Sequence, residues 1–192
     1  MLKALGISGS PRRGGNSETL LEAALDGTRA AGAETELVRL NELSFVGCQA
    51  CDACFEAGRC PQPDGLAPVL DRLREADVWL LASPIYFDSI SAQLKLCFDR
   101  CRCFIRDPGK AERRRSGALI VTYEASRTAF YEDVARHFVG YFDGWFGTFG
   151  CVDVMAEAGL GPAGAAAARP ELLARARALG ERLVRSLCQE RV

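Results

Sequence analysis

The chain has 192 residues, which is enough for one sizeable domain with a buried core and leaves little room for a second. Hydrophobic residues make up 48% of it and charged residues 26%, a composition that excludes intrinsic disorder as the overall description. With 24 basic and 25 acidic residues, the net charge of −1 provides no bulk field that would attract nucleic acid or an anionic membrane, so neither is expected as a partner.

The N-terminal segment enters a strand-like run at once. It has no basic stretch followed by an apolar run of about 7–15 residues and a small-residue cleavage site. No uninterrupted apolar run approaches the roughly 20 residues needed to span a bilayer. We therefore expect a cytoplasmic protein. Nine cysteines in such a chain favour metal binding or thiol chemistry over a disulfide framework.

Short strand-like runs alternate along the chain with longer helical stretches. In chain order, this pattern predicts strand 3–8, helix 16–31, strand 35–40, helix 66–75, strand 77–82, helix 89–104, strand 117–122, helix 129–145, strand 151–155, a loop at 159–168 and helix 170–188. Such alternation implies right-handed crossovers and a parallel sheet covered by helices on both faces. We predict one flavodoxin-like α/β domain over residues 1–192, a doubly wound five-stranded parallel sheet in the order 2-1-3-4-5. A cysteine-rich insertion at residues 47–63 interrupts it.

The segment that follows the first strand, Gly9 to Thr19, is rich in glycine and in hydrogen-bond donors. Ligands of open parallel sheets bind beyond the carboxyl ends of the strands, where the strand order reverses, and the first strand borders that point. Glycines let backbone N–H groups approach an anion, and the next helix adds its positive N-terminus. The predicted phosphate-binding residues are Ser10, Arg12, Asn16 and Ser17.

These donors suit a terminal phosphate monoester such as that of FMN. The segment matches neither the Walker loop nor the G-x-G-x-x-G dinucleotide fingerprint. The alternative is a polar turn whose serine or asparagine only caps the helix.

Two strings in this chain, GISGSPRRGGNSETL and SPIYFDSISAQLK, resemble the phosphate loop and the third-strand loop of the NADPH-dependent FMN reductase family of flavodoxin-like proteins. The resemblance covers about residues 3–103 and implies an FMN-dependent oxidoreductase that uses NAD(P)H. It also implies FMN contacts from Pro84, Ile85, Tyr86 and Phe87. The two aromatic rings can form an apolar wall for the flat flavin ring, although core or interface packing is the alternative. Tyr123, after the fourth strand, is predicted to contact FMN from a third loop.

Four of the cysteines form the motif Cys48-x2-Cys51-x2-Cys54-x5-Cys60. Thiolates on a short segment can converge on one soft metal centre, and bacterial ferredoxins use a similar run that ends, as here, in Cys-Pro. The spacing resembles that of the iron–sulfur flavoproteins, a branch of the same family. That resemblance implies that these four cysteines bind a 4Fe–4S cluster that exchanges electrons with FMN. Zinc and free thiols are the alternatives.

The remaining unusual residues are given structural roles. Buried cysteine behaves as a small hydrophobic residue, so packing is predicted for Cys97, Cys101, Cys103, Cys151 and Cys188. The solitary His137 is predicted to lie at the surface or an interface, and no catalytic residue is predicted, because hydride transfer to a flavin needs no protein acid or base. Further structural roles are a solvated turn at 113–115, an ion pair or dimer contact for Asp99 and Arg100, and core or interface packing for the aromatic residues of 138–146.

The function predicted from these features is electron transfer between a reduced nicotinamide or ferredoxin-like donor, FMN and the cluster. Two alternatives stand beside it: an NAD(P)H:FMN or quinone reductase without a cluster, and a non-enzymatic redox carrier. The expected partners are a small-molecule or redox-protein donor and acceptor. The family resemblance implies a homodimer or a tetramer.

Overall fold

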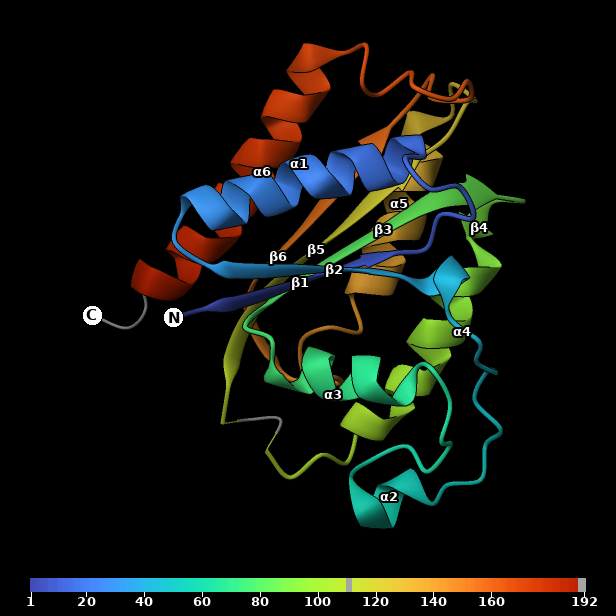
Figure 1. Ribbon diagram of the computed structural model, residues 1–192, viewed down its shortest axis with the longest axis vertical. Coiled ribbons are helices and arrows are strands. Elements are labelled where there is room, and N and C mark those ends of the chain that lie inside the picture. The colour runs from blue at the N-terminus through green and yellow to red at the C-terminus, as the bar shows by residue number, and fades with distance from the viewer. Residues whose placement is uncertain (110–111, 190–192) are drawn as a thin grey trace.

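Parallel strands form the centre of the molecule, and helices cover both faces (Figure 1). The computed structural model describes residues 1–109 and 112–189. The strands are β1 Lys3–Ser8, β2 Glu34–Arg39, β3 Val78–Tyr86, β4 Ser89–Ile90, β5 Arg114–Thr122 and β6 Thr148–Glu157. The order is β2-β1-β3-β5-β6, with all neighbours parallel, and the two-residue β4 pairs with β3 in antiparallel fashion. Apart from β4, this is the predicted 2-1-3-4-5 order, which confirms the flavodoxin-like fold class.

The helices lie in two layers. They are α1 Asn16–Ala30, α2 Cys54–Ala57, α3 Ala67–Glu75, α4 Ala92–Arg100, α5 Thr128–Val139 and α6 Pro170–Gln189, with short 3₁₀ turns η1 Leu40–Glu42 and η2 Cys101–Phe104. α1 and α6 cover one face of the sheet, and α3, α4 and α5 cover the other (Figure 1). Within residues 1–109 and 112–189, no helix combines the length and the apolar character needed to cross a membrane.

The alternation of side chains along β3 divides the core in two. Trp79 and Leu81 point to the face covered by α3, α4 and α5, whereas Val78 and Leu80 point to the face covered by α1 and α6. Both sets are buried, which explains why this strand is a nearly unbroken apolar run in the sequence.

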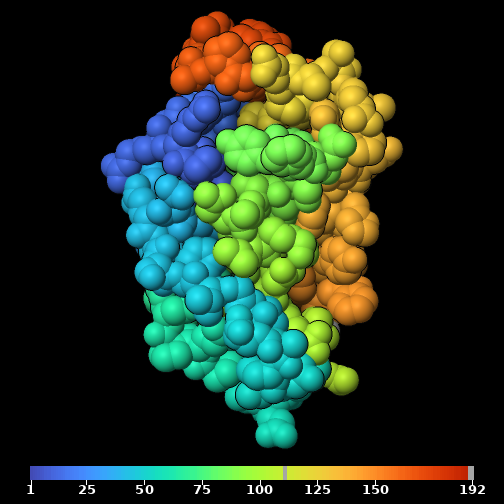
Figure 2. All heavy atoms as spheres, turned by 90° about the vertical axis from the view of Figure 1, so that its right-hand side faces the viewer, coloured from blue at the N-terminus to red at the C-terminus, as the bar shows by residue number. Residues whose placement is uncertain are grey.

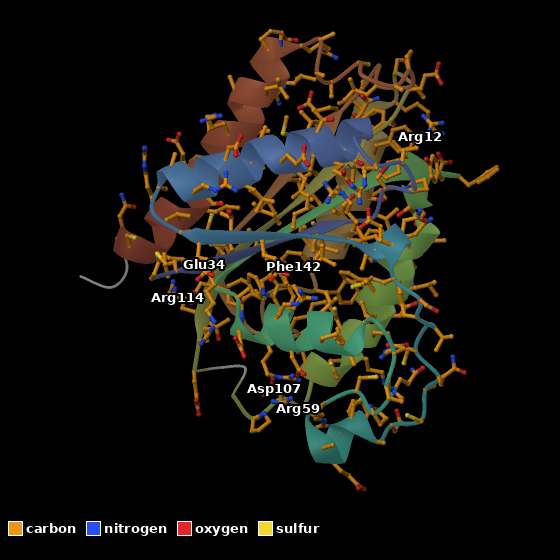
Figure 3. All side chains as sticks on the ribbon, in the orientation of Figure 1. Arg12, Glu34, Arg59, Asp107, Arg114 and Phe142 are labelled. Atoms are coloured by element: carbon orange, nitrogen blue, oxygen red, sulfur yellow. The ribbon has the colours of Figure 1, made fainter. Side chains whose placement is uncertain are left out.

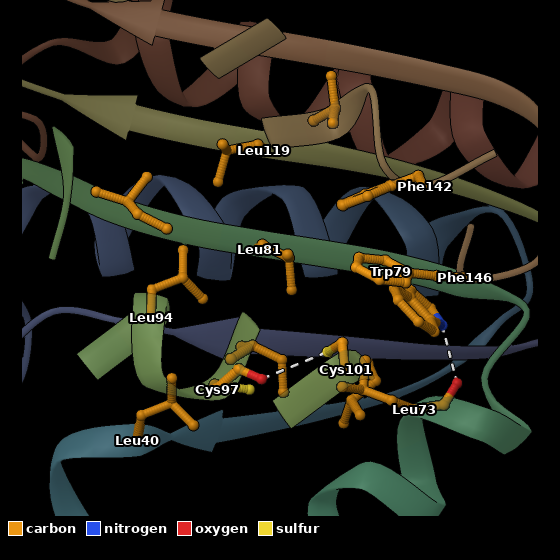
Figure 4. Packing of buried hydrophobic residues seen from close by; sticks show 14 of the residues in the cluster. Leu40, Leu73, Trp79, Leu81, Leu94, Cys97, Cys101, Leu119, Phe142 and Phe146 are labelled. Atoms are coloured by element: carbon orange, nitrogen blue, oxygen red, sulfur yellow. Dashed lines mark hydrogen bonds between the residues drawn. The ribbon is translucent and has the colours of Figure 1, made fainter. Parts of the chain in front are cut away.

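Trp79 is the centre of the first core and is only 1% exposed. Its ring lies 5.3 Å from that of Phe149, 5.4 Å from Phe104 and 5.9 Å from Phe142, measured between ring centroids. Its indole N–H donates a hydrogen bond of 2.9 Å to the carbonyl oxygen of Leu73 at the end of α3 (Figure 4). This cluster joins the sheet to the helices and confirms core packing for part of the aromatic run.

For two helices, one of the two predicted boundaries is wrong. The helix predicted for 89–104 starts later, because Ser89 and Ile90 pair with β3 and the Ser91 hydroxyl caps α4 by accepting the N–H of Leu94 at 3.3 Å. The helix predicted for 129–145 ends at Val139. Beyond it, Gly144 has a φ of 77°, which lies outside the helical region.

The solvated turn predicted for residues 113–115 is also wrong. Arg115 belongs to β5 and is 3% exposed. Its guanidinium donates to the carbonyl oxygens of Ala76 at 3.2 Å and Arg74 at 2.8 Å. Burial, together with the nearby charge of Arg113, lowers the pKa of Arg115 to about 10. The side chain therefore fastens the start of β5 to the end of α3.

Asp99 and Arg100 do not pair with each other. Asp99 accepts from Lys95 at 2.6 Å, one helical turn away, and Arg100 pairs with Asp64 at 2.7 Å. Consecutive helical residues point in different directions, so each finds its own partner. Packing is confirmed for the buried Cys97, Cys101 and Cys103, whereas Cys188 is exposed.

Candidate functional site

A cavity of about 280 Å³ lies at the carboxyl ends of β1, β3 and β5. This is the end of the sheet that carries Arg12, opposite the end that carries Glu34 and Arg114 (Figure 3). Figure 2 shows the blue, green and orange-red segments that surround it meeting at one end of the molecule. The strand order reverses between β1 and β3, so the cavity occupies the place where doubly wound sheets bind ligands.

The cavity brings together eight of the nine side chains predicted to bind the cofactor. They come from the loops after three different strands and are Ser10, Arg12, Asn16, Ser17, Pro84, Ile85, Tyr86 and Tyr123. Gly15, Thr122, Glu124, Leu160, Gly161 and Ala163 complete the lining. Loop residues separated by more than 100 positions thus share one wall.

The loop after β1 is held in shape by its own hydrogen bonds. The Ser10 hydroxyl donates to the carbonyl oxygen of Arg12 at 2.8 Å and accepts the N–H of Arg12 at 3.1 Å. A Cβ atom at position 15 would lie 2.6 Å from Ser10 Oγ and 3.1 Å from Arg12 O, so this close approach needs Gly15. Gly14, with a φ of 66°, supplies the left-handed turn before it.

Two side chains of this loop remain available to an anion. The Arg12 guanidinium is exposed and makes no ion pair with any residue in 1–109 or 112–189. The Ser17 hydroxyl, in the first turn of α1, has no hydrogen-bond partner in that same part of the chain, and the residue is 2% exposed. With the positive N-terminus of α1 beside them, these groups can hold a doubly negative phosphate.

Asn16 lines the cavity, but its side-chain amide is already engaged. Its N–H₂ group donates to the carbonyl oxygens of Leu160 at 2.6 Å and Pro162 at 2.8 Å, and its oxygen accepts the N–H of Ala166 at 3.0 Å. Asn16 therefore holds the loop after β6 in place as a cavity wall. The sequence offered one signal for this wall, namely its position directly after the last strand, where such loops converge.

The opposite wall is formed by the end of β3 and by Tyr123. Tyr86 is 45% exposed beside the cavity, whereas the predicted contact Phe87 does not line it and is fully exposed. Phe87 and Asp88 form a two-residue turn between β3 and β4 with φ values of 47° and 60°. This turn type directs the Phe87 ring into solvent.

The buried carboxylate of Glu18 stabilises the loop after β1. Glu18 is 1% exposed and accepts hydrogen bonds from the Ser8 hydroxyl at 2.8 Å, the Gly14 N–H at 3.0 Å and Arg39 Nε at 2.9 Å. Burial alone would raise the pKa of Glu18, but the three hydrogen bonds and the positive charge of Arg39 outweigh it and lower the pKa below 4.5. The ionised carboxylate fixes Gly14 and hence the turn of the loop.

Glu18→Gln is expected to lower the free energy of unfolding at pH 7 by about 1–3 kcal/mol, because a buried charge-assisted network loses its acceptor. Since the pKa of Glu18 is lowered by folding, its contribution is complete above pH 4.5 and is lost as the pH falls through the folded-state value. Denaturant titrations across this pH range should show that the free energies of unfolding of the parent protein and of Glu18→Gln become equal in acid. The matched control is Glu22→Gln, which removes a 51% exposed partner of Arg39. An equal loss of unfolding free energy in Glu18→Gln and Glu22→Gln at pH 7 would contradict the stabilising role assigned to the Glu18 carboxylate.

The cysteine motif lies in the irregular segment around α2, at the bottom of Figure 1. All four of its thiols are free of disulfide bonds. Cys54 begins α2 and is buried, Cys48 and Cys60 are half-buried, and Cys51 is exposed. Burial first, and then the negative charges of Cys60 and Cys48, raise the pKa of the Cys54 thiol.

The cysteine sulfurs do not form a closed ligand set. Within residues 1–109 and 112–189, no three or more histidine, cysteine, aspartate or glutamate side chains are arranged to hold a metal ion. The donor type and the crowding of the thiols fit an iron–sulfur cluster or another soft metal centre.

A larger cavity, of about 480 Å³, lies beside Cys48 between α4 and the chain that follows α5, on the face shown in Figure 2. Its walls combine aromatic side chains, among them Phe98, Tyr141 and Trp145, with charged ones such as Lys95 and Arg102. It has no glycine-rich loop and does not lie at the strand ends, so it lacks the two features that make the smaller cavity a candidate phosphate site.

Comparison with known proteins places this site in a family context. The protein family described as NADPH-dependent FMN reductase matches residues 2–148. An iron-sulfur flavoprotein of Methanocaldococcus jannaschii is 37% identical over 141 residues, which are 73% of this chain and 72% of that protein. One from Methanosarcina thermophila is 35% identical over 119 residues, which are 62% of each.

Solved structures agree with the fold. An NAD(P)H:quinone oxidoreductase from Methanothermobacter marburgensis superimposes with a TM-score of 0.70 at 20% identity, covering 95% of this chain and 96% of its own. A flavodoxin from the domain Archaea gives a TM-score of 0.56 at 13% identity, covering 96% of this chain and 97% of its own. At these identities the likeness concerns the fold alone.

Proposed function

Because the chain belongs to the NADPH-dependent FMN reductase family and is an FMN-dependent oxidoreductase, we propose that FMN binds in the cavity at the carboxyl ends of β1, β3 and β5. One observation carries the proposal. Arg12 and Ser17, which have no side-chain partner among residues 1–109 and 112–189, line the same cavity as Tyr86 and Tyr123. When bound, FMN supplies two-electron chemistry toward a nicotinamide and one-electron chemistry toward other partners.

The residues divide the work of binding between two ends of the cavity. Arg12 and Ser17 would bind the phosphate, while Ser10 and Asn16 keep the loop and the cavity wall in shape. At the other end, residues 84–86 and Tyr123 would hold the flavin ring and exclude water from it. Phe87 stays a predicted contact that requires the β3–β4 turn to move.

We further propose that Cys48, Cys51, Cys54 and Cys60 hold a 4Fe–4S cluster. Two observations support this proposal: four free thiols lie in one short segment, and relatives of the chain are named iron-sulfur flavoproteins. When bound, such a cluster accepts and releases one electron at a time. The electron donor would be a reduced nicotinamide or a ferredoxin-like protein.

A second candidate is an NAD(P)H:FMN or quinone reductase without a cluster. The observation in its favour is that the four cysteine sulfurs do not converge in this structure. The two candidates share the FMN cavity and differ only in the role of the cysteine segment.

Anaerobic reconstitution with iron and sulfide separates the two candidates. The cluster proposal expects about four irons and four sulfides per chain beside one FMN. Cys60→Ala should lose the iron and keep FMN, whereas the matched control Cys97→Ala, at a buried cysteine outside the motif, should keep both. FMN without iron in the parent protein would favour the second candidate. Failure to bind FMN would remove both.

The expected assembly and compartment belong to the same proposal. We propose a homodimer or a tetramer that works in the cytoplasm. Sedimentation velocity of the FMN-loaded protein tests the assembly, and a monomer at micromolar concentration would contradict it.

A further inference from the structure

An ion pair between the buried Arg100 and the half-buried Asp64 lies next to the cysteine motif. Arg100, the last residue of α4, is 1% exposed, and its Nη1 lies 2.7 Å from Asp64 Oδ2. Asp64 precedes α3 and accepts the N–H of Leu66 at 3.1 Å through its other oxygen. Arginine is almost never fully buried unless its charge is paired, so this position has a specific structural demand.

The Arg100–Asp64 pair holds both ends of the segment that carries the motif. At the entrance, Arg100 Nη1 donates to the carbonyl oxygen of Val46 at 2.9 Å, and Asp64 accepts the N–H of Val46 at 3.2 Å. At the exit, Arg100 Nη2 donates to the carbonyl oxygen of Gln62 at 3.4 Å. Residues 47–61 therefore form a loop whose two ends are hydrogen-bonded to one ion pair.

The same guanidinium also contacts a sulfur atom of the motif. Arg100 Nε donates a hydrogen bond of 3.0 Å to Cys60 Sγ. The neighbouring Arg102 behaves differently, because its Nη2 bonds the exposed Asp52 at 2.6 Å and its guanidinium lies over the Phe55 ring. Of these two arginines close in sequence, Arg100 alone donates directly to a motif cysteine.

We propose that Arg100 is the positioning residue of the cysteine motif, which fixes the place of Cys60 and continues to donate a hydrogen bond to its sulfur when that sulfur is a cluster ligand. The inference rests on the proposed cluster. Reduction adds negative charge to the ligand sulfurs, so a buried N–H donor with a positive charge stabilises the reduced state and raises the reduction potential. The fork geometry of arginine lets one side chain fasten the loop and contact the sulfur together.

The test is the midpoint potential of the anaerobically reconstituted holoprotein, read by potentiometric titration of its cluster signal. Arg100→Gln is expected to shift the potential to more negative values and to lose iron faster than the parent protein. The matched control Arg102→Gln removes a nearby positive charge without removing a bond to sulfur, and should shift the potential less. Asp64→Asn, which frees the Arg100 charge from its counter-ion, should shift it in the opposite direction.

Each result separates the inference from the proposal on which it rests. If the parent protein binds FMN but takes up no iron, the cluster proposal is contradicted and the FMN proposal is not. If the parent protein does hold a cluster, two results overturn the role of Arg100. One is an unchanged reduction potential in Arg100→Gln, and the other is an equal shift of the potential in Arg102→Gln. FMN binding and circular dichroism report the folding of every variant. If Arg100→Gln does not fold, Asp64→Asn decides, and a potential equal to that of the parent overturns the role.

Discussion

Replacing Trp79 with alanine is expected to lower the free energy of unfolding by about 3–5 kcal/mol, the usual cost of truncating a fully buried aromatic side chain. The ring is 1% exposed and packs against Phe104, Phe142 and Phe149 on the face covered by α3, α4 and α5. Alanine would leave a cavity among these rings and would deprive the carbonyl oxygen of Leu73 of its donor. Urea titrations followed by circular dichroism measure the loss.

The second tryptophan of the chain gives a matched control. Trp145 is 52% exposed, and its ring packs edge-on against Tyr141, with 5.8 Å between the centroids. Trp145→Ala is expected to change the free energy of unfolding by less than about 1 kcal/mol. Equal losses of unfolding free energy in Trp79→Ala and Trp145→Ala would show that the aromatic cluster around Trp79 does not stabilise the core more than a surface contact does.

Arg12→Ala is expected to weaken the binding of FMN by about 10- to 100-fold. Hydrogen bonds to charged groups contribute about 1.5–3 kcal/mol, and each 1.4 kcal/mol corresponds to a factor of about ten. Arg12 lines the cavity and has no ion pair within the described residues 1–109 and 112–189, so its guanidinium needs no other partner broken before it binds phosphate. Quenching of flavin fluorescence gives the affinity, and binding of riboflavin, which lacks the phosphate, should be unaffected.

The adjacent arginine controls for net charge. Arg13 carries the same charge, pairs with Glu42 at 3.0 Å through Nε and does not line the cavity. Arg13→Ala is expected to change the FMN affinity by no more than about twofold, as for an exposed surface charge. A comparable loss in both variants, or an equal loss of riboflavin binding in Arg12→Ala, would mean that Arg12 does not contact the phosphate.

The order of the strands and the place of the cavity could be predicted because they follow from local pattern. The apolar runs at β1 and β3 and the 3.6-residue period of α1 identify their elements, and parallel topology then brings the strand-end loops together. The β3–β4 turn was hidden because two residues with positive φ, Phe87 and Asp88, carry no glycine or asparagine signal.

Contacts between distant residues could not be predicted. Asn16 was predicted as a phosphate ligand, yet its amide is bonded to residues 144–150 positions away. For Asp99 and Arg100 the prediction is an ion pair or a dimer contact, whereas Arg100 pairs with Asp64, 36 positions away in the loop before α3. Such side chains are placed by tertiary packing, and a single sequence contains no local pattern that reports it.

Equilibrium binding of FMN and of riboflavin to the parent protein tests directly whether the loop after β1 binds phosphate. The cavity is expected to bind one FMN per chain and to bind riboflavin at least about tenfold more weakly, because only FMN offers a phosphate to Arg12, Ser17 and the N-terminus of α1. Equal affinity for the two flavins, or no binding of either, would contradict the assignment of this loop as a phosphate site.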